Sequence, residues 1–101
     1  MAKRLQFLPE AFVEIGKIAD WYADQNSQIA ERFLATLERI LSSIVRNPHR
    51  GAFHDAEKRH RFRRVGRFPY LVVYREESED ILIVAVYHTS RRPDFWQERL
   101  E

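Results

Sequence analysis

Two stretches in the second half of the chain have the pattern of neighbouring β-strands. Residues 68–75 are rich in aromatic and β-branched side chains, which suit a pleated surface. Residues 81–87 are apolar without interruption, which predicts a strand that is buried on both faces in the middle of a sheet. The acidic run at 76–80 lies between them and predicts a turn, because such side chains are rarely buried.

The first half of the chain has helical periodicity instead. Apolar side chains recur every three or four positions in residues 10–25 and again in residues 27–46. Pro9 suits the first turn of the first helix, and Asn26 or Ser27 is predicted to cap the second. Because so few residues connect the two helices, we expect them to pack as an antiparallel hairpin.

The remaining pattern completes an α+β fold. Residues 4–8 and 61–65 alternate weakly and predict two further strands, and residues 49–60 predict a loop. The expected order is β-α-α-β-β-β: an N-terminal strand at the sheet edge, a two-helix hairpin packed on a four-stranded antiparallel sheet, and a short C-terminal tail or helix. One core is expected to contain Leu37, Ile40, Leu41, Val72 and Val84.

Length and composition restrict the class of protein. The chain has 101 residues, 45% of them hydrophobic, which suits one globular domain over residues 1–101. It has no cysteine, which excludes a disulfide scaffold and a thiol nucleophile. It also lacks an apolar run of signal length or of the roughly 20 residues that span a bilayer. We therefore expect a soluble, cytoplasmic protein with no membrane partner.

Positive charge is concentrated in one segment, although the net charge is only +2. No acidic residue lies between Glu57 and Glu76. This clustering favours an anionic partner, and arginine is a common ligand of nucleic-acid phosphates. The alternative is an edge strand that its charge protects from aggregation. The basic residues of this segment are Lys58, Arg59, Arg61, Arg63, Arg64 and Arg67. The candidates for nucleic-acid binding are Arg61, Arg63 and Arg92.

Polar residues follow the buried strand directly, beginning with His88, Arg91 and Arg92. Histidine can act as a general acid or base near neutral pH, and arginine can stabilise charge that develops on a phosphate. The alternative is structural. In that interpretation His88 caps a backbone group, and the arginines pair with Asp94 or Glu98.

Two further groups are interpreted as structural. Tyr70, Tyr74 and Tyr87 alternate along strands and are expected in the core, whereas Trp96 is left open. The loop also contains possible metal ligands, but their spacing matches no metal motif, so neither a metal nor a cofactor is predicted. These possible ligands are His54, Asp55, Glu57 and His60.

Taken together, these features resemble a known family. The chain has a leading strand, a helical hairpin ending in N-P, a basic stretch, F-P-Y-L-V-V-Y-R, an acidic turn, I-L-I-V-A-V-Y-H and R-R-P-x-x-W. Their order and spacing resemble the RelE/ParE superfamily of type II toxins. The resemblance implies a small growth-inhibiting toxin, linked to plasmid stabilisation, that is neutralised by a cognate antitoxin in a hetero-oligomer.

The resemblance implies two possible targets. A RelE-like toxin cleaves mRNA on the ribosome, and here Arg64, Arg67, His88 and Arg91 would be catalytic, with Glu57 or His88 as base. A ParE-like toxin instead inhibits DNA gyrase, and the long helical hairpin favours this branch. A third alternative is a relic that binds its antitoxin and has no toxicity.

Overall fold

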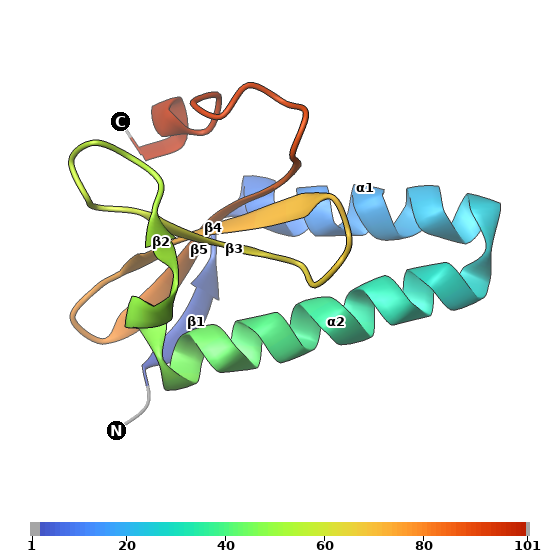
Figure 1. Cartoon of the computed structure of the whole chain (residues 1–101), viewed down its shortest axis with the longest axis horizontal. Coiled ribbons are helices and arrows are strands. Elements are labelled where there is room, and N and C mark those ends of the chain that lie inside the picture. Colours follow the sequence, from blue (N-terminus) through green and yellow to red (C-terminus); the bar gives the residue numbers. More distant parts are fainter. Residues whose placement is uncertain (1–2, 101) are drawn as a thin grey trace.

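The computed structural model describes residues 3–100 and has the expected α+β architecture (Figure 1). The strands are β1 (Arg4–Phe7), β2 (Ala52–Phe53), β3 (Arg61–Arg64), β4 (Tyr70–Glu76) and β5 (Asp80–His88). The helices are α1 (Pro9–Gln25), α2 (Ser27–Arg46) and two short 3-10 turns, η1 (Pro48–Arg50) and η2 (Gln97–Leu100). No helix in residues 3–100 combines the length and apolar character needed to cross a bilayer.

The sheet differs from the prediction in strand number and in one direction. It has five strands in the order β1-β5-β4-β3-β2. The extra strand, β2, lies in the segment 49–60, for which the sequence predicts a loop. It has only two residues, and both pair with β3. As expected, β1 lies at an edge, but it runs parallel to β5. The parallel arrangement is possible because the helical hairpin and three strands separate β1 from β5 in the chain, which leaves ample length for a crossover.

The junction between the two helices of the hairpin is defined by Asn26. The Asn26 side chain accepts a hydrogen bond from the Gln28 backbone N–H at 2.8 Å, which caps α2. The Asn26 N–H in turn donates to the Tyr22 carbonyl at 2.7 Å and ends α1. One residue therefore serves both helices, and the two run side by side as predicted (Figure 1).

The hairpin covers one face of the sheet and forms the first of two cores. The predicted Leu37 and Val72 are buried there, and Ile40 and Leu41 pack at its margin. The other principal members are Phe33, Ile44, Tyr74, Ile81, Ile83 and Val86. This arrangement confirms that the apolar stripe of α2 faces the sheet.

Val84 was expected in the same core and instead belongs to a second one on the opposite face. A β-bulge is the physical reason: Val73 pairs with Ala85 and Tyr74 with Ile83, so Val84 is an extra residue in β5. Val84 and Ala85 both pack in the second core with Trp96 from the C-terminal segment. The prediction that β5 is buried on both faces is confirmed.

Candidate functional site

The predicted nucleic-acid ligands on β3 lie on the helix side of the sheet and already have protein partners. The Arg61 Nη1 donates to the Gly51 carbonyl at 2.7 Å, and its guanidinium lies 3.9 Å from the centre of the Phe53 ring. Arg63 Nη1 donates to the Ser43 hydroxyl of α2 at 3.1 Å. Both side chains thus hold the strand against neighbouring elements, and binding of nucleic acid by them stays a prediction.

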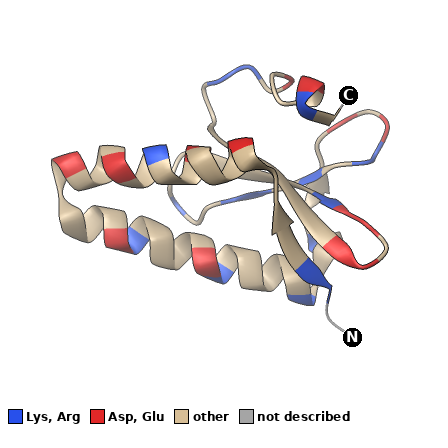
Figure 2. Ribbon diagram, turned by 180° about the vertical axis from the view of Figure 1, so that it is seen from behind, with Lys and Arg blue, Asp and Glu red and all other residues tan. Residues whose placement is uncertain are grey.

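Arg64 and Arg67 lie at the turn between β3 and β4 but differ in their surroundings. Arg64 closes the turn, because its Nε donates to the Phe68 carbonyl at 3.0 Å and its Nη2 to the Arg67 carbonyl at 3.3 Å. The Arg67 residue lines a pocket beside α2 together with Arg32 and Arg39. Figure 2 shows basic positions on β3 and its loops, whereas the charged positions of α1 are mostly acidic.

His88, the last residue of β5, and Arg92 have the structural roles that the alternative interpretation gave them. His88 Nδ1 accepts from the Ser90 backbone N–H at 3.0 Å, so the ring caps the end of the strand. Arg92 pairs with Asp94 at 2.9 Å. Arg91 differs from the expectation, since its guanidinium stacks 3.7 Å from the centre of the Phe95 ring.

The four residues predicted to act together in RNA cleavage do not share one face of the sheet. Arg64 is the cross-strand neighbour of Leu71, whose side chain packs in the second core. His88 is the neighbour of Tyr70, which packs against the first core, and the two rings are 5.2 Å apart. Arg64 and His88 therefore point to opposite sides. The proposed base Glu57 is exposed in the loop between β2 and β3.

The loop that contains the possible metal ligands is ordered by hydrogen bonds between the buried side chain of Asp55 and its neighbours. Asp55 Oδ1 accepts from the backbone N–H groups of Arg59 and His60, both at 3.0 Å. Its Oδ2 lies 2.9 Å from His60 Nδ1, and both side chains are less than a tenth exposed. Within residues 3–100, no group of three acidic or histidine side chains is placed to hold a metal ion.

Two histidines of this loop contact the second core. His54 Nε2 lies 2.7 Å from the Tyr87 hydroxyl, and the Trp96 ring lies 5.2 Å from His54 and 4.7 Å from His60. The sequence did not predict that these two histidines pack against Tyr87 and Trp96. The available signal was Asp55, a residue type that often organises loops through its backbone contacts. Trp96, Tyr74 and Tyr87 are buried, which confirms the prediction for the two tyrosines.

Burial and hydrogen bonding shift two pKa values in this loop. Burial lowers the pKa of His54, because a partly desolvated imidazolium is unfavourable. Burial by itself raises the pKa of Asp55, but hydrogen bonds from the His60 side chain and backbone outweigh it, so the pKa lies below its ordinary value. Both shifts mean that the unfolded chain binds protons more readily than the folded chain in acid.

As the pH is lowered, the free energy of unfolding is expected to decrease in two steps. The pKa of His54 is lowered in the folded chain. Its contribution to folding stability is therefore complete above pH 6.5, the ordinary pKa of histidine, and declines below that pH. The contribution of Asp55 is present above its ordinary value of 3.8 and is lost as pH falls through the lower folded value. Urea unfolding from about pH 7.5 to about pH 5 measures the first step. His54→Gln should reduce this step, and an unchanged step would contradict the assignment.

The C-terminal segment is fastened to the sheet by Glu14 of α1 and Arg99 of η2. β1 pairs with β5 only over Asp80–Ile83, so the edge of β5 beyond Ile83 lacks a neighbouring strand. Glu14 Oε1 accepts from the Val86 N–H at 3.0 Å, and Arg99 Nη1 donates to the Val84 carbonyl at 3.0 Å. The two side chains also form a bidentate pair at 2.9 and 2.8 Å, which raises the pKa of Arg99.

The fold and the positions of these residues can be compared with known proteins. The family model for the ParE toxin of type II toxin–antitoxin systems, parDE, matches residues 5–93. This chain belongs to the ParE toxin family. The match extends from β1 through the hairpin, the sheet and the first residues of the C-terminal segment, so it confirms the resemblance to the RelE/ParE superfamily.

A solved structure has the same ParE-type fold at low sequence identity. It is described as the chromosomal ParDE TA system from P. aeruginosa, with a TM-score of 0.74 and 16% identity. The match covers 86% of this chain and 96% of that chain. Among curated proteins, none matches this chain.

Proposed function

We propose that this ParE-family toxin inhibits DNA gyrase and that a cognate antitoxin holds it inactive in a toxin–antitoxin hetero-oligomer. The family match over residues 5–93 carries the proposal, because it includes both the hairpin and the sheet. The similar P. aeruginosa structure is of a ParDE system and supports an antitoxin partner. Gyrase is an intracellular target, so the proposal implies a cytoplasmic protein.

The surroundings of the catalytic candidates do not favour RNA cleavage. General acid–base chemistry on one phosphate needs its donors within hydrogen-bond reach of that phosphate. Arg64 and His88 lie on opposite faces of the sheet, and the Nδ1 atom of His88 is occupied by Ser90. A ribosome-dependent nuclease would require these side chains to leave their present partners. The nuclease therefore remains the second candidate, and the non-toxic relic the third.

The three candidate functions can be distinguished in cells by comparing the growth arrest caused by the wild type with that caused by variants of His88 and Arg91. We expect expression without antitoxin to arrest a bacterial host, and we expect His88→Ala and Arg91→Ala to arrest it as strongly as the wild type. If these residues catalysed RNA cleavage, loss of a transition-state donor would reduce the rate by about 10² to 10³ and relieve the arrest. A folded wild-type chain without any effect on growth would favour the relic.

A further inference from the structure

Three arginines of α2 form a row along one side of the helix. Arg32, Arg39 and Arg46 are spaced seven residues apart, which is close to two helical turns, so they lie nearly in line. At about 1.5 Å of rise per residue, neighbouring members lie about 10 Å apart along the helix axis, and the row extends over about 20 Å. All three residues are exposed to solvent. This arginine row presents a line of positive charge at the surface.

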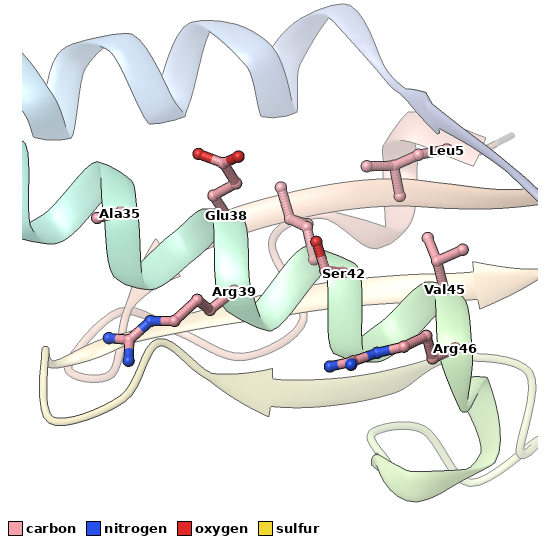
Figure 3. Close-up of a pocket in the computed structure, with 8 residues that line it drawn as sticks. Leu5, Ala35, Glu38, Arg39, Ser42, Val45 and Arg46 are labelled. Atoms are coloured by element: carbon pink, nitrogen blue, oxygen red, sulfur yellow. The ribbon is translucent and has the colours of Figure 1, made fainter.

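The arginine row and the two glutamates of α2 lie on different sides of the helix. Glu31 and Glu38 each directly precede a member of the row, which places them about 100° around the helix from it. Figure 3 shows Glu38 extending towards α1, whereas Arg39 and Arg46 extend to the side away from α1. No member of the row forms an ion pair with another side chain of residues 3–100. The positive charge of the row is therefore available to a ligand.

A pocket of about 490 Å³ lies beside the row, where the turn between β3 and β4 meets α2. The turn contributes Arg67, which also forms no ion pair in the part of the chain that the structure describes. Among residues 3–100, no acid lines the pocket, so its three arginines lack a counter-charge in the lining. The lining residues are Arg32, Thr36, Arg39, Gly66, Arg67 and Phe68.

Thr36 holds this pocket in shape. Its hydroxyl donates to the Arg32 carbonyl at 2.8 Å and accepts from Arg39 Nη2 at 3.2 Å, which orients that guanidinium. The turn before Arg67 approaches Thr36 closely: a Cβ atom on Gly66, whose φ is +55°, would lie 2.8 Å from the Thr36 methyl group. The guanidinium of Arg39 is thus ordered before a ligand arrives, which lowers the entropic cost of binding.

The extent of the arginine row favours a ligand with repeated negative charge. One guanidinium is enough to bind both oxygens of a single carboxylate. A row of about 20 Å instead matches the backbone of a nucleic acid, since each strand of duplex DNA carries a phosphate about every 3.4 Å along the axis. These arginines differ from Arg61 and Arg63, which are held by partners within the chain.

The row and the pocket have no free aromatic ring on which a base could stack. The large exposed aromatic side chains belong to α1 and β2: Phe12, Trp21 and Phe53. Phe68 lines the pocket but is half-buried, and its ring packs edge-on against Tyr22 and Phe33. Single-stranded nucleic acids gain much of their affinity from stacking on aromatic side chains. The surface therefore suits the backbone of a duplex better than the bases of a single strand.

We propose that α2 binds the sugar–phosphate backbone of duplex DNA through the arginine row, with one phosphate in the pocket completed by Arg67. Phosphate contacts position a protein but carry no sequence information, so the binding is independent of DNA sequence. The inference rests on the proposed function for its setting, because gyrase acts on duplex DNA and a toxin bound to gyrase lies beside this ligand.

The salt dependence of DNA binding measures these contacts. Fluorescence anisotropy of a short labelled duplex, titrated with the full chain at several salt concentrations, gives the slope of log K against log salt. Each phosphate contact contributes about 0.9 to the magnitude of this slope. We expect Arg39→Gln and Arg46→Gln each to lower it by about 1 and to weaken binding about fivefold at about 0.1 M salt. Arg46→Lys should retain the slope because it retains the charge.

A matched control removes the same charge from another exposed position. Lys17→Gln on α1 should bind the duplex as the wild type does, because Lys17 lies outside the row and the pocket. Circular dichroism confirms that each variant is folded. In a supercoiling assay, Arg39→Gln and Arg46→Gln should each require about fivefold more toxin for half-inhibition of gyrase, and Lys17→Gln should require no more than the wild type.

The outcomes separate this inference from the function on which it rests. If the wild type inhibits gyrase and both arginine variants retain its slope or its inhibition, the inference is wrong and the proposed function stands. If DNA binding depends on the arginines but the wild type does not inhibit gyrase, the DNA site stands and the proposed function is wrong. Tighter arginine-dependent binding to an RNA duplex of the same sequence would assign the row to RNA and overturn the inference.

Discussion

Trp96→Ala is expected to lower the free energy of unfolding by about 3–5 kcal/mol, as is typical when a large buried aromatic side chain is truncated. Trp96 is 0% exposed and is the largest fully buried side chain. It fills the second core against Val84 and the rings of His54 and His60. Its removal leaves a cavity under the C-terminal segment that the rigid sheet cannot close.

The chain contains its own control for this prediction. Trp21 on α1 is 57% exposed, so Trp21→Ala should change the free energy of unfolding by no more than about 0.5 kcal/mol. Urea unfolding followed by far-ultraviolet circular dichroism measures both variants without depending on tryptophan fluorescence. Equal effects of the two substitutions would contradict the second core.

Glu14→Ala is expected to cost about 3 kcal/mol, the lower end of the range for buried pairs, because it breaks a largely buried ion pair from one side. The side chains of Glu14 and Arg99 are 15% and 14% exposed, so solvent screens their charges little. Without the carboxylate, the guanidinium of Arg99 and the N–H of Val86 each lose a partner. The cost should therefore exceed that of an ordinary surface ion pair, which contributes roughly 0–1 kcal/mol.

Two further variants determine whether the ion pair itself is responsible. Glu10→Ala removes an exposed acid from the same helix and should have an effect within about 0.5 kcal/mol. Replacing both partners, as Glu14→Leu with Arg99→Met, should recover much of the stability, because no unpaired charge is then buried. A Glu14→Ala cost no larger than that of Glu10→Ala would show that the C-terminal segment is held without this contact.

Local sequence signals predicted the elements of the fold well. Helical periodicity located α1 and α2, and Asn26 marked the junction, because capping depends on neighbours in the chain. The parallel direction of β1 and the two-residue strand β2 were not predictable in this way. Both depend on pairing with distant residues, and a strand as short as Ala52–Phe53 has too few positions for any periodicity.

The candidate site was less predictable because its residues interact across long separations. Glu14 and Arg99 meet although 85 positions separate them. The bulge at Val84 places that residue on the face of the second core. No glycine or turn residue in β5 indicates the bulge in the sequence. Clustered arginines were visible in the sequence, but alternation along β3 directs Arg63 and Arg64 to opposite faces. The pocket of Arg32, Arg39 and Arg67 joins a helix to a distant turn.

The proposed action on gyrase is tested most directly by adding increasing amounts of the purified toxin to gyrase, ATP and relaxed plasmid. We expect supercoiling to be inhibited in proportion to the toxin added and to be restored by an excess of antitoxin. In parallel, ribosomes translating a defined mRNA should show no cleavage at the same toxin concentrations. Unimpaired supercoiling together with mRNA cleavage on the ribosome would contradict the proposal and establish the nuclease instead.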